Sequence, residues 1–139
     1  MNIQPYLSLD GRAQEAIDFY KEAIGAKVEM VMHFKDAPPE MQSQINPASR
    51  DKVMHACIKV GDTPVFLTDG SCNNKAVFSG VTLTLNADSD AQAEKLFKAL
   101  TKDGGKETMP MTETFFATRF GMLADKFGVA WMILKAKQP

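Results

Sequence analysis

The sequence predicts an α+β fold of two β-α-β-β-β modules that form a half-barrel cleft. The first observation is that the same order of elements recurs at an offset of roughly 80 residues. The second is that, in each copy, an alternating strand leads into an amphipathic helix that a glycine ends, with a lysine close behind. These stops are Gly25 with Lys27, and Gly104 with Lys106. Duplicated units often meet face to face, and ligand sites form where they meet.

The expected organisation is a single domain over residues 1–139, with repeat modules at about 1–69 and 79–139. A chain of this length can bury a core of ordinary size. The formal net charge of −1 provides no basic footprint for nucleic acid. No apolar run approaches the ~20 residues of a membrane span, and the N-terminus carries no secretory pattern. We therefore expect a protein that binds neither nucleic acid nor membrane.

The two cysteines indicate the compartment. Cys57 and Cys72 are too few for a disulfide framework, and they lack CxxC spacing. Reduced thiols are typical of cytoplasmic proteins, so we expect a cytoplasmic location.

Two amphipathic helices are expected, one in each module. In the first, Asp10 is the expected N-cap and Gly25 the expected left-handed C-terminal residue. The second runs from about 91 to 100, and Ser89 with Gln92 resembles a capping box at its start. Each helix has an apolar face that can cover one side of a sheet. In the first helix this face consists of Ala13, Ala16, Ile17, Tyr20 and Ile24.

The strands are expected to be apolar on one face and semi-polar on the other. At 81–85 the odd positions are apolar, which leaves Thr82 and Thr84 on the opposite face. At 53–60 the same alternation places His55 away from the helix. A sheet with helices on one face and semi-polar side chains on the other can line a cleft. The remaining strands are expected at about 3–9, 27–34, 64–68, 106–111, 115–123 and 129–135.

Two polar segments interrupt this pattern. Residues 35–51 are rich in Pro, Gln, Asn and Ser, and a loop of this length is expected to be a lid or a disordered, solvated edge. Residues 69–79 link the modules and are expected to act as a hinge.

Several short segments together resemble one protein family. They are Pro5-Tyr6-Leu7-Ser8 followed by Gly11, Glu15-Ala16-Ile17-Asp18-Phe19-Tyr20, Asp51-Lys52-Val53-Met54-His55-Ala56, Glu113-Thr114-Phe115-Phe116, Arg119-Phe120-Gly121-Met122 and Asp125-Lys126-Phe127-Gly128 with the five residues after it. The chain resembles the PhnB-like branch of the vicinal oxygen chelate superfamily, the glyoxalase/bleomycin-resistance/dioxygenase group, over nearly its whole length. This resemblance implies the glyoxalase/bleomycin resistance-like fold and a homodimer. Some similar chains carry a ubiquinone-pathway methyltransferase label, but no glycine-rich strand-to-helix loop for S-adenosylmethionine is present.

The resemblance also implies a divalent metal held by one side chain from each of four strands. Only one of the matching positions here carries a side chain that can ligate, Gln4, through its amide oxygen. Hard divalent ions need several oxygen or imidazole ligands, so we expect neither a family-type metal nor another cofactor. The other positions fall on Phe66 or Leu67, on Gly80, and on Met132 or Trp131.

His55 is the candidate catalytic residue, because the usual imidazole pKa suits general acid–base chemistry. The alternatives are a core histidine and a residue that lines the cleft. Arg119 occupies nearly the same place in the second repeat and could clamp a carboxylate or phosphate with its planar fork. The alternative for Arg119 is a structural ion pair with Glu113, Asp125 or Glu107.

The proposed ligand-binding set combines these two residues with aromatic and polar neighbours on the expected cleft face. Aromatic residues in strands are also common in ordinary cores, so a purely structural role is the alternative. Cys57 is interpreted as a buried, inert thiol. The set is Tyr6, His55, Phe66, Thr82, Phe116, Arg119 and Trp131.

These observations favour a protein that binds a small organic molecule in a cleft, without the usual metal. The alternative is a lyase, isomerase or dioxygenase of the vicinal oxygen chelate type with a non-standard site, and whether the chain is an enzyme stays open. A third alternative is a structural dimer module with a collapsed cleft.

Overall fold

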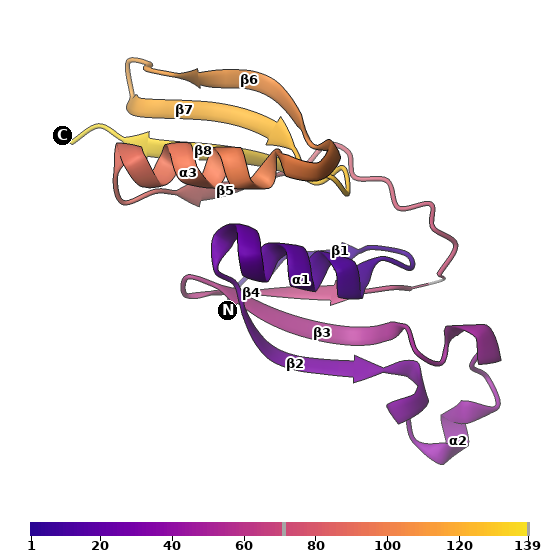
Figure 1. Ribbon diagram of the computed structural model, residues 1–139. Helices are drawn as coiled ribbons and strands as arrows, with labels where there is room; N and C mark the ends of the chain where they lie inside the picture. The colour runs from indigo at the N-terminus through magenta and orange to yellow at the C-terminus, as the bar shows by residue number, and fades with distance from the viewer. Residues whose placement is uncertain (71, 139) are drawn as a thin grey trace. The chain divides into compact units, whose positions relative to one another are not determined.

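A computed structural model describes residues 1–70 and 72–138 of the chain (Figure 1). The chain divides into two compact units, Met1–Ala76 and Val77–Pro139. Each unit contains one four-stranded sheet and one long helix, which confirms the α+β class and the predicted repeat. None of the helices formed by the described residues is long and apolar enough to cross a membrane.

Unit 1 contains the first copy of the repeat. Its sheet has the strand order β1-β4-β3-β2, in which β1 runs parallel to β4 and the other neighbours are antiparallel. Three short helices fill the connection from β2 to β3, so this part of the expected loop is folded. The elements are β1 (Tyr6–Ser8), α1 (Ala13–Ile24), β2 (Lys27–His33), η1 (Phe34–Asp36), α2 (Pro39–Gln42), η2 (Pro47–Ser49), β3 (Val53–Val60) and β4 (Thr63–Thr68).

Unit 2 repeats this topology. Its sheet has the order β5-β8-β7-β6, in which β5 runs parallel to β8 and the other neighbours are antiparallel. The elements are β5 (Thr82–Asn86), α3 (Asp90–Leu100), η3 (Lys102–Gly104), β6 (Lys106–Thr112), β7 (Ala117–Ala124) and β8 (Ala130–Ala136).

The residues predicted to end and to cap the helices are confirmed in part. Gly25 ends α1 with φ at +67°, a conformation that glycine adopts without steric cost, as predicted. Ser89 caps α3 by accepting a hydrogen bond from the Gln92 backbone N–H at 3.0 Å. The Gln92 side chain accepts from the backbone N–H of Asp88 at 2.6 Å, one residue earlier than a standard capping box requires.

The expectation that Asp10 caps α1 is wrong. Its carboxylate accepts hydrogen bonds from the backbone N–H groups of Asn73 and Lys75, both at 3.0 Å, and so ties the connection after β4 to unit 1. The first N–H groups of α1 are satisfied instead by Asp69, which lies far away in the sequence.

Each long helix covers one face of its own sheet, with α1 in contact with β2 and β3, and α3 in contact with β7 and β8. The core of each unit lies beneath its helix, and we call the opposite side of each sheet its open face. In unit 1 this core includes Leu9, Ala16, Ile17, Tyr20, Val53, Ile58 and Leu67. In unit 2 it includes Ala93, Phe97, Leu100, Leu123, Trp131 and Ile133.

Candidate functional site

An aromatic cluster lies on the open face of unit 1. Strand pairing places Tyr6 of β1 beside Phe66 of β4, with ring centroids 6.2 Å apart. The His55 ring of β3 lies 5.1 Å from the Phe66 ring and 5.8 Å from the Tyr6 ring. Tilted and edge-to-face arrangements at these distances are favourable for aromatic rings. The structure therefore brings together Tyr6, His55 and Phe66, three of the predicted ligand-binding residues.

The cluster is partly open to solvent. Tyr6 is 59% exposed, whereas His55 and Phe66 are half-buried. The His55 side chain has no hydrogen-bond partner within residues 1–70 and 72–138. Its ring nitrogens are therefore available to a ligand, but no carboxylate orients the imidazole as a general base usually requires. The neighbouring Cys57 is half-buried, with its Sγ 3.8 Å from the Ile58 carbonyl oxygen.

A second aromatic cluster lies in unit 2. Phe116 contacts Phe115 and Phe120, with ring centroids 5.1 and 5.4 Å away. Phe115 is 92% exposed, and Phe116 is also exposed. Thr82 of β5 is exposed, as the alternation predicts. Phe116 and Thr82 thus stay candidates for ligand contact.

Arg119 does not occupy the face that the sequence predicts. Its Nε lies 3.1 Å from Glu94 Oε1 on α3, and its Nη1 donates to the Thr118 carbonyl at 2.7 Å. Arg119 therefore lies on the helix-covered side of β7. Gly121, two residues on, is on that side too, because a Cβ there would come within 2.8 Å of Phe97 Cε2.

The cause is a one-residue offset between the two repeats. The pairing of β7 with β8 is unbroken from Arg119 to Ala124, so strand alternation places Arg119 on the same face as the buried Gly121 and Leu123. Phe120 takes the open face instead, where it contacts Phe116. The ion pair foreseen as an alternative does form, but with Glu94 rather than with Glu113, Asp125 or Glu107.

Trp131, which was expected to contact a ligand, lies in the core of unit 2. It is only 4% exposed, and its indole N–H donates to Asp125 Oδ2 at 2.9 Å. The buried Asp125 carboxylate also accepts from the backbone N–H groups of Phe127 and Val129, which closes the turn from β7 to β8. Trp131 is therefore a core residue of unit 2, and the expectation that it lines a ligand site is not compatible with this position.

The donor set at the family's metal positions does not fit a divalent ion. Leu67 is fully buried in the core, Phe66 belongs to the aromatic cluster, and Trp131 offers only a donor. Gln4 remains the single side chain with a ligating oxygen. In the part of the chain that the structure describes, no three His, Cys, Asp or Glu side chains gather as a metal site requires.

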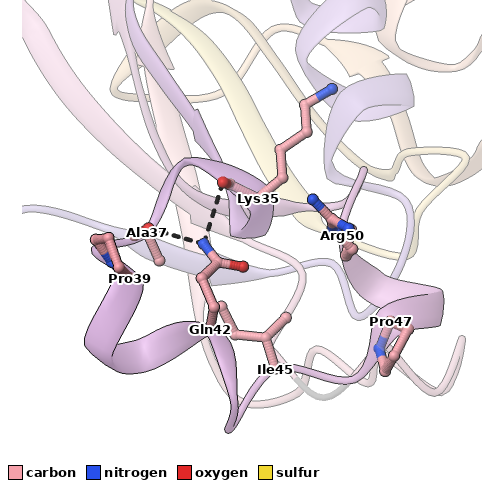
Figure 2. A pocket seen from close by; sticks show the side chains of 7 residues that line it. All are labelled: Lys35, Ala37, Pro39, Gln42, Ile45, Pro47 and Arg50. Atoms are coloured by element: carbon pink, nitrogen blue, oxygen red, sulfur yellow. Dashed lines mark hydrogen bonds between the residues drawn. The ribbon is translucent and has the colours of Figure 1, made fainter.

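The connection from β2 to β3 contains a pocket that the sequence analysis did not identify (Figure 2). Its volume is about 500 Å³, and it shares no residue with the aromatic cluster. The Gln42 side-chain amide donates to the carbonyls of Ala37, Lys35 and Phe34, at 2.7, 3.1 and 3.4 Å. The pocket is lined by Lys35, Ala37, Pro39, Gln42, Ile45, Pro47 and Arg50. The sequence signal lies only in the composition of this segment, which carries three prolines and two cations, Lys35 and Arg50.

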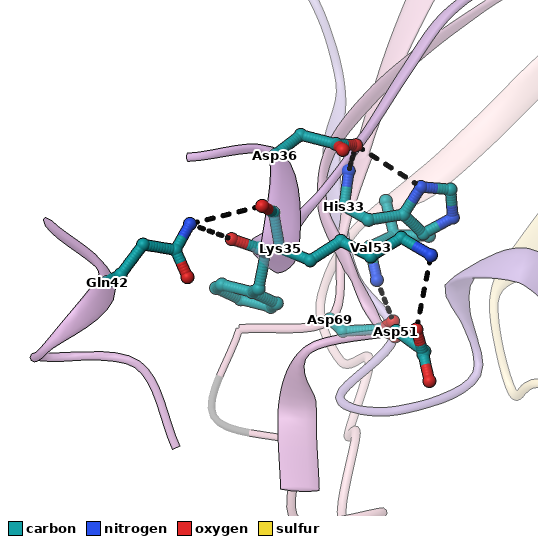
Figure 3. A network of polar contacts seen from close by, with 8 residues as sticks. His33, Lys35, Asp36, Gln42, Asp51, Val53 and Asp69 are labelled. Carbon is teal, nitrogen blue, oxygen red and sulfur yellow. Dashed lines mark hydrogen bonds and ion pairs between the residues drawn. The ribbon is translucent and has the colours of Figure 1, made fainter. Parts of the chain in front are cut away.

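Polar contacts fasten both ends of this segment to unit 1 (Figure 3). At its start, the Asp36 carboxylate accepts from the His33 backbone N–H at 3.0 Å, and the His33 ring lies 3.6 Å away. At its end, Lys35 Nζ lies 3.3 Å from Asp51 Oδ1. Beside it, the buried Asp69 carboxylate accepts from the Val53 backbone N–H at 2.8 Å.

Comparison with known proteins relates the whole chain to one family. Residues 1–134 match the family described as 3-demethylubiquinone-9 3-methyltransferase. Protein YjdN from Escherichia coli (strain K12) is 32% identical over 144 residues, which cover 99% of this chain and 97% of YjdN.

Solved structures show the same fold. Protein PA1353 from Pseudomonas aeruginosa has a TM-score of 0.84 and 35% identity, over 99% of both chains. The putative 3-demethylubiquinone-9 3-methyltransferase, PhnB protein, from Bacillus cereus has a TM-score of 0.79 and 23% identity, over 98% of this chain and all of that one. A glyoxylase/bleomycin resistance protein/dioxygenase domain from Frankia has a TM-score of 0.64 and 16% identity, over 98% and 95%. The fold is thus of the glyoxalase/bleomycin resistance type.

Proposed function

Since the chain belongs to the 3-demethylubiquinone-9 3-methyltransferase, or PhnB-like, family, we propose that it binds a small, planar organic molecule. The ligand lies against the open face of unit 1, in contact with Tyr6, His55 and Phe66. No family-type divalent metal takes part in this binding.

The observation that carries the proposal is the aromatic cluster on a face without a helix of its own unit. Tyr6 and Phe66 offer ring surfaces for an apolar body. The His55 ring nitrogens, which have no partner among the described residues, can form a hydrogen bond to it. Apolar walls with a few polar groups that set orientation are typical of small-molecule sites. The donor set supports a site without the family's metal, since Gln4 alone cannot hold a hard divalent ion.

Methyl transfer is the second candidate, because the family description names it. Cofactor sites often use free backbone N–H groups at the start of a helix. At the start of α1, the N–H groups of Gly11 and Ala13 both donate to Asp69 at 2.8 Å, so they are not available. Titration with S-adenosylmethionine separates the two candidates, since we expect no saturable heat of binding. A stoichiometric heat would favour methyl transfer.

We also propose a homodimer in the cytoplasm. Exposed apolar side chains such as Val77 and Val81 are the kind of surface that pairing covers. Both cysteines are free thiols, which suits a reducing compartment. Light scattering at micromolar concentration should give twice the chain mass, and a monomer mass would contradict the dimer.

Binding can be tested by nuclear magnetic resonance, because the chain has only two histidines. Indole is a suitable probe, since it is planar and its N–H can donate to the imidazole. Saturating indole should shift the His55 ring signals and leave those of His33, in the segment after β2, unchanged. Tyr6→Ala should weaken binding roughly three- to tenfold, the size expected for the loss of one aromatic contact.

The matched control is Phe115→Ala, which removes a more exposed ring from unit 2. This variant should bind indole as the unmodified protein does. The proposal is wrong if indole leaves the His55 signals unmoved, or if Tyr6→Ala binds indole with unchanged affinity.

A further inference from the structure

We propose that the connection from β2 to β3 forms a second, independent binding site, a pocket for a small organic monocarboxylate that Arg50 anchors. It goes beyond the function proposed above, because none of its lining residues belongs to the aromatic cluster of Tyr6, His55 and Phe66.

Hydrogen bonds within the segment hold the walls of the pocket in place. Its volume of about 500 Å³ lies within the range of small-molecule sites. One side chain, Gln42, holds the wall together by donating to three backbone carbonyls across the segment. The Asn46 side chain caps η2 by accepting from the Ala48 N–H at 3.0 Å, which fixes the opposite wall. A pocket whose walls are fixed in this way loses little entropy when a ligand binds.

The charge of the lining selects a monoanion. Two of the lining residues are cations, Lys35 and Arg50, and none is an acid. Lys35 is already paired with Asp51, at 3.3 Å. Within residues 1–70 and 72–138 the Arg50 guanidinium has no ion-pair or hydrogen-bond partner. One positive charge is therefore left over, and it matches a carboxylate better than a doubly charged phosphate. The planar fork of arginine suits a carboxylate, which it can bind with two parallel hydrogen bonds.

The remaining lining groups define the rest of the ligand. Because the Gln42 amide nitrogen is engaged with carbonyls, its oxygen is left as an acceptor, and Figure 2 shows it directed toward the side with Ile45 and Arg50. It can accept from a ligand O–H or N–H. The walls beside it are apolar, made by Pro39, Ile45 and Pro47. The site therefore suits a carboxylate joined to an apolar body that carries one hydrogen-bond donor.

The probe that tests this site is 4-hydroxyphenylacetate, which has a carboxylate, a ring and a hydroxyl donor. Titration followed by nuclear magnetic resonance should shift the Arg50 side-chain Nε–H and the backbone amides of residues 37–50. We expect a dissociation constant near the millimolar range, as for other ligands of about ten heavy atoms. The neutral isostere, 4-hydroxyphenylacetamide, should bind at least about tenfold more weakly, because it lacks the charge.

Substitutions of Arg50 test whether its guanidinium binds the carboxylate of the ligand. Arg50→Gln should weaken binding of the acid about tenfold or more while it leaves the fold intact, because Arg50 is exposed and only its backbone serves the local structure. Arg50→Lys should recover only part of the affinity, since an ammonium lacks the fork. Lys21→Gln removes an exposed charge from α1 and is the matched control, which should leave the affinity unchanged.

Three results would overturn the proposal. They are equal affinity for the acid and its amide, unchanged affinity in Arg50→Gln, and shifts confined to His55 and the aromatic cluster. The last would show that the acid uses the open face of unit 1 instead.

Discussion

The Asp69 carboxylate and the backbone N–H of Ala13 form a buried hydrogen bond of 2.8 Å, although 56 residues separate them in sequence. The same carboxylate accepts from Gly11 and from Val53, also at 2.8 Å. Asp69 is 1% exposed. One side chain just after β4 therefore joins the start of α1 to the start of β3, and it replaces the cap that α1 does not have locally.

Asp69→Ala should strongly destabilise the protein. It leaves three backbone N–H groups without their acceptor, and each unsatisfied buried group costs about 1–3 kcal/mol. We expect a loss of at least about 3 kcal/mol in the free energy of unfolding, measured by denaturant titration. Asp18→Ala, on the exposed side of α1, is the control and should change stability by less than about 0.5 kcal/mol. A loss below about 1 kcal/mol for Asp69→Ala would contradict this role.

Trp131→Phe should destabilise unit 2. The change removes the indole N–H that donates to the buried Asp125, which costs about 1–3 kcal/mol. Because Trp131 is the only tryptophan, its fluorescence should be blue-shifted in the native protein and should report the unfolding of unit 2. Because the variant has no tryptophan, its unfolding is followed by circular dichroism instead. Stability equal to that of the unmodified protein would show that the hydrogen bond is not significant.

Arg119→Ala should have little effect. Its ion pair with Glu94 is half-exposed, and such pairs contribute about 0–1 kcal/mol. A double-mutant cycle with Glu94→Ala should therefore give a coupling energy below about 1 kcal/mol. Indole affinity should not change, because Arg119 lies on the helix-covered face. If Arg119→Ala weakened indole binding more than Tyr6→Ala, our placement of the ligand would be incorrect.

The hydrogen bonds that the Asp10 carboxylate accepts should be lost at acid pH. Hydrogen bonds from the backbone of Asn73, and then of Lys75, lower the pKa of Asp10 below its usual value of 3.8. A lowered pKa means that the stabilisation is fully present above pH 3.8 and is lost as the pH falls through the lower, folded-state value. The amide signals of Asn73 and Lys75 should titrate with a midpoint below 3.8. Asp10→Asn should abolish this step, and a midpoint above 3.8 would refute the contact.

Removal of metal should not change stability. The family positions offer only Gln4 as a ligating side chain, so dialysis against a chelator should leave the melting temperature unchanged. A bound metal stabilises the folded state by mass action, and its loss would lower the melting temperature. A drop that one divalent ion reverses would therefore establish a metal site.

Much of the fold was determined by the sequence alone, because the signals are local. Strand alternation and helix periodicity are properties of short segments, so the repeated β-α-β-β-β order, Gly25 and Ser89 were predicted correctly. The aromatic cluster followed in part from the same alternation, which placed His55 and Tyr6 on one face. The pairing of β1 with β4 then brought Phe66 beside them.

Only the tertiary structure decided the features that depend on distant or irregular contacts. Asp69 caps α1 from 56 residues away, and no local pattern encodes that pairing. Arg119 shares a face with the buried Gly121 and Leu123, and an offset of one residue between the two repeats was enough to predict the opposite face. In the pocket around Arg50, the Gln42 side chain donates to three backbone carbonyls, within a segment whose composition alone indicated a lid or a disordered edge.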